Sequence, residues 1–375
     1  MLALGLMSGT SMDGIDAALL RTDGVDRVEP LGVLHFPYDD AMRGAIRGAI
    51  AAPDDAAITG AVECALTDRH ADIVAHLLAD NDVDAAALDV VGFHGQTILH
   101  DPAHGVTRQI GDGARLARLT GCRVVNDFRS ADMAAGGEGA PLAPVFHAAL
   151  GQSLDLPVCV LNVGGVANVT WIGAATDGGS GLDGGGVFDR LLAFDTGPGG
   201  ALIDDWVLTH TGAAFDEGGA LAAQGTADAA ALACLLEHAY FAAPPPKSLD
   251  RNDFDAGPVA GLAPADGAAT LLAFTVESVV RARDLLPGTP KRWLVTGGGR
   301  HNATLMAALR WRLDAPVDPV EAVGWDGDAL EAQAFAYLAV RRLRGLPASG
   351  PTTTGASGLV IGGVVNEPGA AAVPA

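Results

Sequence analysis

Three glycine-rich segments in this 375-residue chain combine small residues with acids, hydroxyls or amides. They read Gly9-Thr10-Ser11-Met12-Asp13-Gly14-Ile15-Asp16, Phe194-Asp195-Thr196-Gly197-Pro198-Gly199-Gly200 and Gly297-Gly298-Gly299-Arg300-His301-Asn302. Glycines let backbone N–H groups approach phosphate oxygens, and hydroxyls add donors. A carboxylate among them can hold a magnesium ion through water, or take a proton from a nucleophile. Together the three segments predict an enzyme that grips a nucleotide between two lobes.

The first segment is expected to hold phosphate groups. Gly9 and Gly14 permit close backbone approach, and Thr10 and Ser11 offer hydroxyl donors. Carboxylates cannot donate to phosphate at neutral pH, so at least one of Asp13 and Asp16 is assigned to water-bound Mg²⁺. A plain hairpin turn rich in Gly and Asp has the same composition, and the segment alone does not separate the two interpretations.

Apolar runs indicate where these segments lie in the fold. Residues 2–7 and 15–20 predict a β-hairpin around the first segment. Further strands are predicted over 28–36, 90–93, 158–163, 166–172, 191–194 and 292–296, and helices over 39–51, 58–79, 228–240, 268–286, 302–312 and 328–344. This hairpin-plus-helices unit occurs twice, which predicts α/β layers and two lobes, 1–145 and 146–375. Ligands of such sheets bind at the carboxyl ends of strands.

Composition narrows the class of protein. The formal charge of −22 disfavours binding to nucleic acid or an anionic membrane, and an anionic substrate would need a locally positive site. The four cysteines form no C-x-x-C pair, which favours reduced structural thiols. The N-terminus lacks a basic region and no apolar run is typical of a membrane span, so we expect a cytoplasmic protein. The oligomeric state stays open, a homodimer included.

Seven segments, taken together and in order, resemble the anhydro-N-acetylmuramic acid kinase family. They are residues 5–16, 92–97 (Gly-Phe-His-Gly-Gln-Thr), 109–113 (Gln-Ile-Gly-Asp-Gly), 126–132 (Asn-Asp-Phe-Arg-Ser-Ala-Asp), 162–168 (Asn-Val-Gly-Gly-Val-Ala-Asn), the Asp195 segment and the Gly297 segment. The resemblance implies a two-lobed actin-like ATPase and sugar kinase fold, in which a ribonuclease H-like α/β unit is duplicated around a central cleft. Residues 249–254 depart from the family pattern, where a Thr-Gly-Arg-Glu-like run is expected.

The resemblance also implies a reaction and its cofactors. ATP, with Mg²⁺, and water would convert 1,6-anhydro-N-acetylmuramic acid, a small amino sugar, into N-acetylmuramic acid 6-phosphate and ADP during peptidoglycan recycling. Two alternatives stay open. One is a kinase for another amino sugar without ring opening, and the other is a sugar-sensing or chaperone-like ATPase on the same fold.

Asp195 is the first catalytic candidate. A carboxylate at a strand end, followed by Thr-Gly-Pro-Gly, can take a proton from the attacking water. Capping of the following helix explains the same residues equally well. The resemblance favours the role of general base. Glu331, in the first turn of the last predicted helix, is a secondary catalytic candidate or a residue that complements the helix dipole.

Binding roles are assigned to residues in the other matching segments. Gly164 and Gly165 are expected to face phosphate, Asn168 to lie nearer the sugar, and Gly297, Gly298, Gly299 and Asn302 to form the adenosine and α-phosphate side. A plain hairpin turn explains the first group nearly as well, and a helix N-terminus packed closely on its sheet explains the second equally well. Arg129 is expected to bind the lactyl carboxylate of the sugar, because guanidinium pairs with carboxylate through two parallel hydrogen bonds. A local ion pair with Asp127 or Asp132 is the alternative. His94, Gln96 and Thr97 are candidates for the sugar hydroxyls or the N-acetyl group.

Overall fold

The computed structural model describes residues 1–9, 12–175, 181–250 and 253–369, which divide into two compact units. Unit 1 contains Met1–Gln152, Ala175–Asp189 and Ala329–Ala375, and unit 2 contains Ser153–Ala174 and Arg190–Asp328. The last segment of the chain, predicted to belong with residues 146–328, is thus part of unit 1. The reason is the packing of its helix on the first sheet, described below.

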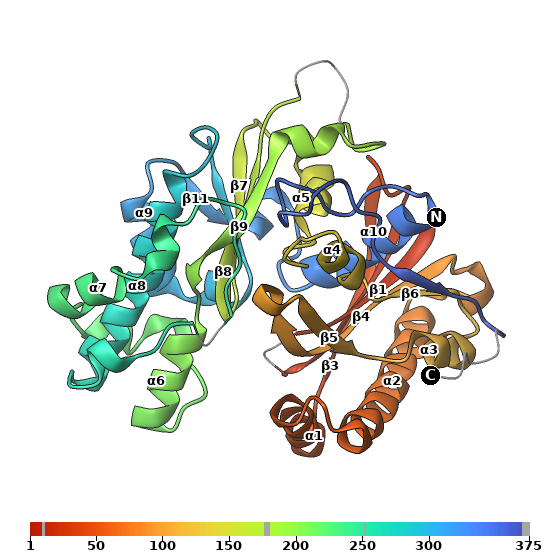
Figure 1. Ribbon diagram of the computed structural model, residues 1–375, viewed down its shortest axis with the longest axis horizontal. Helices are drawn as coiled ribbons and strands as arrows, with labels where there is room; N and C mark the ends of the chain where they lie inside the picture. Colours follow the sequence, from red (N-terminus) through yellow and green to blue (C-terminus); the bar gives the residue numbers. More distant parts are fainter. Residues whose placement is uncertain (10–11, 176–180, 251–252, 370–375) are drawn as a thin grey trace. The chain divides into compact units, whose positions relative to one another are not determined.

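Unit 1 is built on a mixed sheet with the strand order β12-β6-β4-β1-β2-β3, and β5 pairs with β4 (Figure 1). The strands are β1 (Leu2–Ser8), β2 (Gly14–Thr22), β3 (Val28–Pro37), β4 (Val90–Asp101), β5 (Val106–Ile110), β6 (Val124–Asn126) and β12 (Val364–Asn366). β1 and β2 form the predicted hairpin, β3 extends it antiparallel, and β4 runs parallel to β1 and β6.

The fourth strand is longer than predicted. The apolar run ends at Phe93, but β4 continues to Asp101 because β5 pairs with it antiparallel from Gln96 onward. The prediction that His94, Gln96 and Thr97 follow a strand end was therefore wrong, because these residues lie inside β4. A polar stretch can stay extended where a partner strand satisfies its backbone groups.

Six helices accompany the sheet in the described part of unit 1: α1 (Asp40–Ala51), α2 (Ala56–Asp80), α3 (Gly113–Thr120), α4 (Ser130–Ala134), α5 (Pro144–Leu150) and α10 (Leu330–Leu343). The side chains of Asp39 and Asp55 cap α1 and α2 by accepting backbone N–H bonds. Leucine, isoleucine and valine side chains of these two helices pack on one face of β1, β2 and β4 to form a core.

The last helix covers the opposite face, and two glycines allow it to do so. Gly5 of β1 and Gly92 of β4 are paired in register. A Cβ atom at Gly5 would lie 1.8 Å from the carbonyl oxygen of Ala332, and one at Gly92 would lie 2.1 Å from that of Phe335. The backbone of α10 therefore rests directly on the sheet, at a distance that any side chain larger than glycine would prevent.

Unit 2 repeats this strand order. Its strands are β7 (Val158–Val163), β8 (Val166–Ile172), β9 (Leu191–Pro198), β10 (Trp293–Thr296) and β11 (Val317–Pro319). The order β11-β10-β7-β8-β9 has the same pattern as β6-β4-β1-β2-β3, with an antiparallel meander of three strands followed by two parallel additions. This repetition within one chain confirms the predicted duplicated α/β fold.

Four α-helices belong to the described part of unit 2: α6 (Ala201–Thr211), α7 (Ala229–Leu235), α8 (Pro264–Arg283) and α9 (Ala303–Arg312) (Figure 1). Their apolar side chains pack against β7, β8, β9 and β10. The helix predicted over 228–240 is shorter, because residues 239–242 form a separate 3₁₀ turn whose Tyr240 is held by contacts described below. The strand predicted over 191–194 continues to Pro198, so Asp195 lies inside β9 and not after it.

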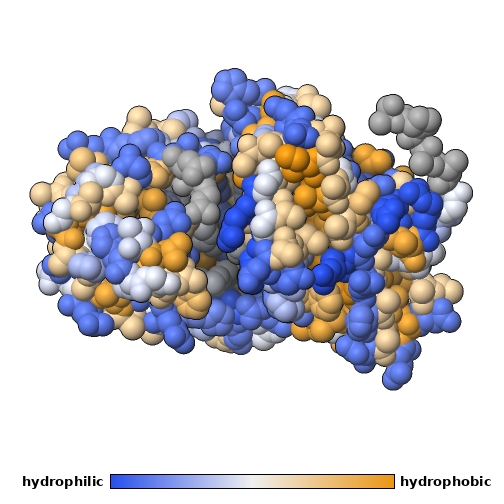
Figure 2. Space-filling model, turned by 90° about the horizontal axis from the view of Figure 1, so that it is seen from below, coloured by the Kyte–Doolittle hydropathy of each residue, from blue (hydrophilic) through white to orange (hydrophobic). Residues whose placement is uncertain are grey.

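The exposed face drawn in Figure 2 mixes hydrophilic and hydrophobic residues. Exposed large apolar side chains occur in both units, and they include Leu31, Val33, Leu208, Phe215 and Trp311. Scattered apolar residues of this kind are ordinary on soluble surfaces. Within the described residues, no helix has the length and apolar character needed to cross a bilayer.

The close packing of α10 predicts that Gly5→Ala strongly destabilises unit 1. The added methyl group has to displace helix backbone, and overpacking of this kind costs about 1–3 kcal/mol or more. Gly44→Ala is the matched control, since Gly44 lies in α1 and a Cβ there meets nothing within 4 Å. The control should be neutral or stabilise the protein by up to about 1 kcal/mol, because alanine favours helix. Free energies of unfolding in urea measure both effects, and equal values for the two variants would contradict this account.

Candidate functional site

The first glycine-rich segment forms the turn between β1 and β2 in unit 1. Thr10 and Ser11 lie outside the described residues. Met12 has a φ of 55° and its N–H donates to the Gly9 carbonyl at 3.2 Å, while Asp13 accepts from the Tyr38 N–H at 2.9 Å. The turn is therefore closed at both ends by backbone bonds.

A buried polar cluster lies beneath this turn. The Ser8 Oγ lies 2.8 Å from the Tyr38 Oη and donates to the Gln96 Oε1 at 2.5 Å, and the Gln96 Nε2 donates to the Gly9 carbonyl at 3.2 Å. Burial raises the pKa of Tyr38, so its hydroxyl stays protonated. Gln96, predicted to bind sugar, thus holds the turn in place. No role was predicted for Tyr38, because nothing in the sequence marks it except that a tyrosine follows β3 directly.

The acids of the turn differ in their surroundings. Asp13 is exposed, and the Asp16 Oδ1 lies 2.7 Å from the His35 Nδ1 on the neighbouring strand. Ile15 is fully buried in the core, which leaves only its backbone for a ligand. Among the described residues, no group of three or more His, Cys, Asp or Glu side chains could hold a metal ion. A magnesium ion here would need water and phosphate oxygens as its main ligands.

His94 and Arg129 are in direct contact. The His94 Nδ1 donates to the Gly95 carbonyl at 2.7 Å, so the Nε2 accepts from the Arg129 Nε at 3.2 Å and Nη2 at 3.0 Å. Burial, and then the Arg129 charge, hold the pKa of His94 well below its usual value. The Arg129 Nη1 donates to the Gly139 carbonyl at 2.8 Å. The imidazole is therefore neutral and helps to fix the guanidinium plane.

The two carboxylates that flank Arg129 in sequence bond to other groups. The Asp127 Oδ1 accepts from the Ser130 Oγ at 2.5 Å. Asp132 is fully buried; its Oδ2 accepts from the Gly139 N–H at 2.8 Å, and its Oδ1 from the Thr354 Oγ1 at 2.6 Å. Asp132 thereby fixes the segment whose Gly139 carbonyl binds Arg129.

The remaining candidates of unit 1 are Glu331 and Thr97. The Phe335 ring packs at a tilt against His94 and Phe128, with centroids 4.6 Å and 5.2 Å apart. Glu331 is exposed and lies one turn before Phe335 on the same side of α10. The Thr97 Oγ1 accepts from the Gln109 Nε2 at 3.3 Å.

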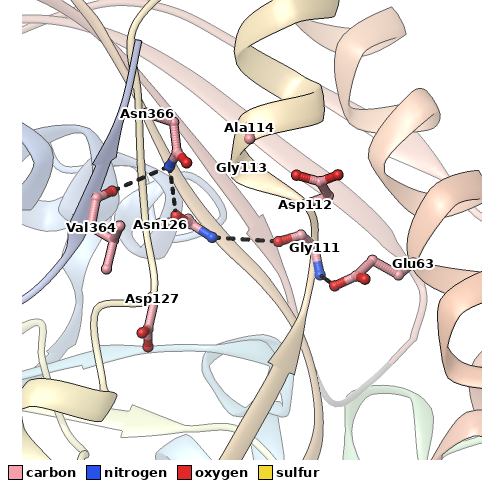
Figure 3. Close-up of a pocket in the computed structure, with 9 residues that line it drawn as sticks. All are labelled: Glu63, Gly111, Asp112, Gly113, Ala114, Asn126, Asp127, Val364 and Asn366. Carbon is pink, nitrogen blue, oxygen red and sulfur yellow. Dashed lines mark hydrogen bonds between the residues drawn. The ribbon is translucent and has the colours of Figure 1, made fainter. Parts of the chain in front are cut away.

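A surface pocket of about 360 Å³ in unit 1 is lined by two of the segments singled out above (Figure 3). The Asn366 Nδ2 donates to the Asn126 Oδ1 at 2.9 Å, and the Gly111 N–H donates to the Glu63 Oε1 at 2.9 Å. The Asp112 Oδ1 caps α3 by accepting from the Arg115 N–H. These polar groups bond to one another, and that role explains them without a ligand.

Asp195 lies on the edge strand of unit 2. Its side chain is 8% exposed, and its Oδ2 accepts from the Leu249 N–H at 2.8 Å. Across the sheet, Asp195 pairs with Asn168, Asn168 with Asn162, and Asn162 with Thr296. Directly paired residues point to the same face, so one polar row crosses four strands. The adjacent residues Leu161, Ala167 and Phe194 point into the core on the opposite face.

The glycine-rich turns of unit 2 meet at the end of its sheet where β7, β9 and β10 finish. The Gly200 N–H donates to the Gly164 carbonyl at 2.7 Å, and the Gly199 N–H to the Gly165 carbonyl at 2.9 Å. Gly297 has a φ of 74°, and a Cβ there would lie 2.3 Å from the Asn162 Oδ1. The sequence-predicted Gly164, Gly165 and Gly297 are thus brought together. Among the described residues, no atom lies closer than 3.5 Å to a Cβ built on Gly165 or Gly298.

Two residues next to these turns have structural partners. The Asn302 Oδ1, predicted to contact nucleotide, caps α9 by accepting from the Leu305 N–H at 2.9 Å. Arg300 is buried, and it pairs with Glu321 at 2.8 Å and donates to the Gly297 carbonyl at 3.0 Å. No role was predicted for Arg300. In the structure, Arg300 anchors the third glycine-rich segment through its bond to the Gly297 carbonyl.

Comparisons with known proteins show the family to which the chain belongs. The model of the family described as anhydro-N-acetylmuramic acid kinase matches residues 1–368. A protein of that name from Rhodospirillum rubrum is 56% identical over 363 residues, with 96% of this chain and 93% of the relative covered. Another from Rhizorhabdus wittichii is 53% identical, with 98% and 99% covered.

The chain belongs to the anhydro-N-acetylmuramic acid kinase family. The resemblance based on seven segments is therefore confirmed. For a member of this family, the polar row of unit 2 and the Arg129–His94 contact of unit 1 are two places where the described residues gather polar and ionisable side chains. The roles of single residues at these places stay predictions.

The buried His70 predicts how the free energy of unfolding depends on pH. His70 is fully buried next to Phe93, and burial lowers its pKa to about 4. Its Nε2 has no hydrogen-bond partner in the part of the chain that the structure describes. The folded state keeps this ring neutral while the unfolded chain binds a proton below about pH 6.5. The neutral His70 ring therefore contributes to the free energy of unfolding above pH 6.5, and this contribution is lost as the pH falls toward 4. The loss is about 2 kcal/mol between pH 7 and pH 5.

His70→Leu removes both the titration and the unpaired nitrogen. We expect urea unfolding to show equal or greater stability than wild type at pH 7 and a smaller loss at pH 5. The same loss in His70→Leu as in wild type would mean that His70 does not titrate with folding.

Proposed function

We propose that this chain transfers the γ-phosphoryl group of ATP to 1,6-anhydro-N-acetylmuramic acid while water opens the anhydro ring. The products are N-acetylmuramic acid 6-phosphate and ADP, and the reaction serves peptidoglycan recycling in the cytoplasm, where ATP is available. Membership of the family supports the substrate. The observation that carries the chemistry is a nearly buried carboxylate, Asp195, oriented by the Leu249 N–H beside the glycine turns. A homodimer stays a prediction.

Asp195 is the general base in this proposal. Water adds its oxygen to the anomeric carbon, and its proton passes to the Asp195 carboxylate. The bond between that carbon and the bridging O6 breaks, O6 forms a bond to the γ-phosphorus, and the bond from phosphorus to the ADP oxygen breaks. Glu331, in the first turn of α10, is the second acid candidate for these proton transfers.

The nucleotide is assigned to the glycine turns. Gly9, Gly14, Gly164 and Gly165 would present backbone N–H groups to phosphate, and Gly297, Gly298 and Gly299 would lie along the adenosine side. The space a Cβ would fill at Gly165 and Gly298 fits a ligand that approaches the backbone. Asn302 would act indirectly, through the cap that orients α9.

Magnesium is assigned to Asp13 and Asp16. Oxygen donors are the ligands that Mg²⁺ prefers, and one or two carboxylates with water and phosphate oxygens are its usual set. Bound there, the ion would neutralise charge on the phosphates. Asp16 is also held by His35, which sets the position of its carboxylate.

The sugar is assigned to Arg129, His94, Gln96 and Thr97 of unit 1 and to Asn168 of unit 2. Arg129 would bind the lactyl carboxylate, and neutral His94 would orient the guanidinium. Gln96 acts mainly through the turn that it holds. Asn168 pairs across the sheet with Asp195, which suits a contact near the anomeric carbon.

Isotope tracing tests the ring-opening reaction. In heavy-oxygen water, turnover of anhydro-N-acetylmuramic acid should place solvent oxygen on the anomeric carbon and phosphate on O6. The same assay with N-acetylmuramic acid and N-acetylglucosamine should give little product. Phosphorylation of those sugars at equal rates, with no solvent oxygen incorporated, would instead indicate a plain amino sugar kinase. ATP turnover without a phosphorylated sugar would indicate an ATPase of another class.

Arg129→Lys tests recognition of the lactyl group. Lysine keeps the charge but cannot bond to His94 and a carboxylate with one planar fork. A charge-assisted bond is worth about 1.5–3 kcal/mol, so kcat/KM for the anhydro-muramic substrate should fall roughly tenfold or more. The control sugar, 1,6-anhydro-N-acetylglucosamine, lacks the lactyl group and should hardly respond to the change. An equal loss with both sugars would show that Arg129 holds its loop through Gly139 and His94 and does not read the substrate.

A further inference from the structure

Asp195 lies on a strand at the edge of its sheet, so its backbone N–H and C=O groups need partners that do not belong to the sheet. β9 is the edge strand of unit 2, and β8 is its neighbour on one side only. Unpaired N–H and C=O groups of a buried edge residue are costly. In this structure both groups of Asp195 are bonded to residues of the segment 240–249, which lies some fifty residues later in the chain.

Three hydrogen bonds form a closed ring at this point. The Asp195 N–H donates to the Lys247 carbonyl at 2.9 Å. The Lys247 Nζ donates to the Tyr240 carbonyl at 2.9 Å, and the Tyr240 Oη donates to the Asp195 carbonyl at 2.5 Å. Each of the three residues is therefore held by the other two. The Leu249 N–H, two residues beyond Lys247, then orients the Asp195 carboxylate.

The surroundings of Lys247 favour this ring over a solvated lysine. Lys247 is 9% exposed, and its Nζ lies 4.3 Å from the centre of the Tyr240 ring and 5.9 Å from that of Phe194. Burial lowers the pKa of the ammonium group. A buried cation needs compensation, and the Tyr240 carbonyl and the two aromatic faces supply it.

We propose that Lys247 and Tyr240 are positioning residues for Asp195, and that the ring holds the Asp195 carboxylate where it can take a proton from water. The inference rests on the role of Asp195 proposed above. It extends that role to two residues that touch Asp195 only through its backbone. A displacement of about 1 Å at a reacting group can cost roughly a hundredfold in rate, so small losses in the ring should be visible in kcat.

Tyr240→Phe is the most specific test, because it removes a single hydroxyl. We expect kcat to fall roughly 10- to 100-fold, while KM for ATP and the binding of a non-hydrolysable ATP analogue stay near wild type. Tyr337→Phe is the matched control. Its hydroxyl also donates to a buried backbone carbonyl, that of Val25 at 2.9 Å, and no role in the reaction is proposed for Tyr337. The control should lose stability and keep its kcat.

Lys247→Met tests the ammonium group, since methionine keeps much of the apolar stem. It should lower kcat with KM for ATP little changed, and Lys247→Arg should restore part of the rate, because arginine keeps a donor and the charge. Lys291→Met, a change of an exposed lysine paired with Asp155, should be silent. Analogue binding by each variant shows that it is folded.

A double variant separates this inference from the proposal on which it rests. Asp195→Asn should lower kcat roughly 10²- to 10⁴-fold. In that background Tyr240→Phe should have almost no further effect on kcat, because it acts only through Asp195. Multiplying effects, or wild-type kcat in Tyr240→Phe, would overturn the positioning role and leave Asp195 as the base. Near wild-type turnover in Asp195→Asn would overturn the base role itself, and the inference with it.

Discussion

The contact between the backbone of α10 and the glycine pair Gly5–Gly92 is the constraint on which unit 1 depends. Because neither strand carries a side chain at this point, the helix lies against the sheet itself. That contact attaches the last part of the chain to the first sheet. It also brings Phe335 against His94 and Phe128, and with Phe335 the first turn of α10 that carries Glu331. The lack of a side chain at Gly5 and Gly92 therefore allows Phe335, and the first turn of α10 with it, to lie close to His94.

The glycine-rich segments share a further feature, which concerns their carbonyl groups. In two of them, a buried side chain donates to a glycine carbonyl: Gln96 to Gly9 and Arg300 to Gly297. Half-buried Arg129 makes the same kind of bond to Gly139, outside these segments. A loop that binds phosphate has to direct N–H groups toward the anion and carbonyls away from it. A side-chain donor on the protein side of the loop does the second of these. The pattern fits the proposed nucleotide role of the Gly9 and Gly297 segments and the proposed sugar role of Arg129.

Hydrophobic patterning predicted most strands, and it predicted most helices with starts near those observed. Asp39, Asp55 and Asn302 each accept a bond from the N–H groups of the helix that follows. The extent of β4 and β9 was missed, because their polar halves are held extended by partners that a local pattern does not contain. The place of α10 was missed for the same reason, since only the packed structure shows which sheet its face covers.

The residues of the candidate site were likewise predicted only in part. The resemblance pointed to Asp195, Asn168 and the glycines, and the structure brings these together within unit 2. It did not point to Tyr38, Tyr240 or Arg300, whose function depends on contacts distant in sequence. The duplication shows the same limit: Asp16 pairs with His35 in unit 1 as Asn168 pairs with Asp195 in unit 2. Equivalent positions carry different chemistry, and only the shared strand order reveals that they correspond.

The large negative charge of the chain and its proposed anionic ligands are compatible for a physical reason. Exposed carboxylates are screened beyond about 8 Å at physiological ionic strength. Near a ligand, a few cations with restricted access to water dominate the local field, because they are screened less. Arg129 and Lys247 are cations of this kind, and each bonds to a backbone carbonyl. These bonds offset the cost of removing the cations from water, and they fix where the positive charge lies. An acidic protein can therefore receive a phosphorylated nucleotide and a sugar carboxylate without a basic surface.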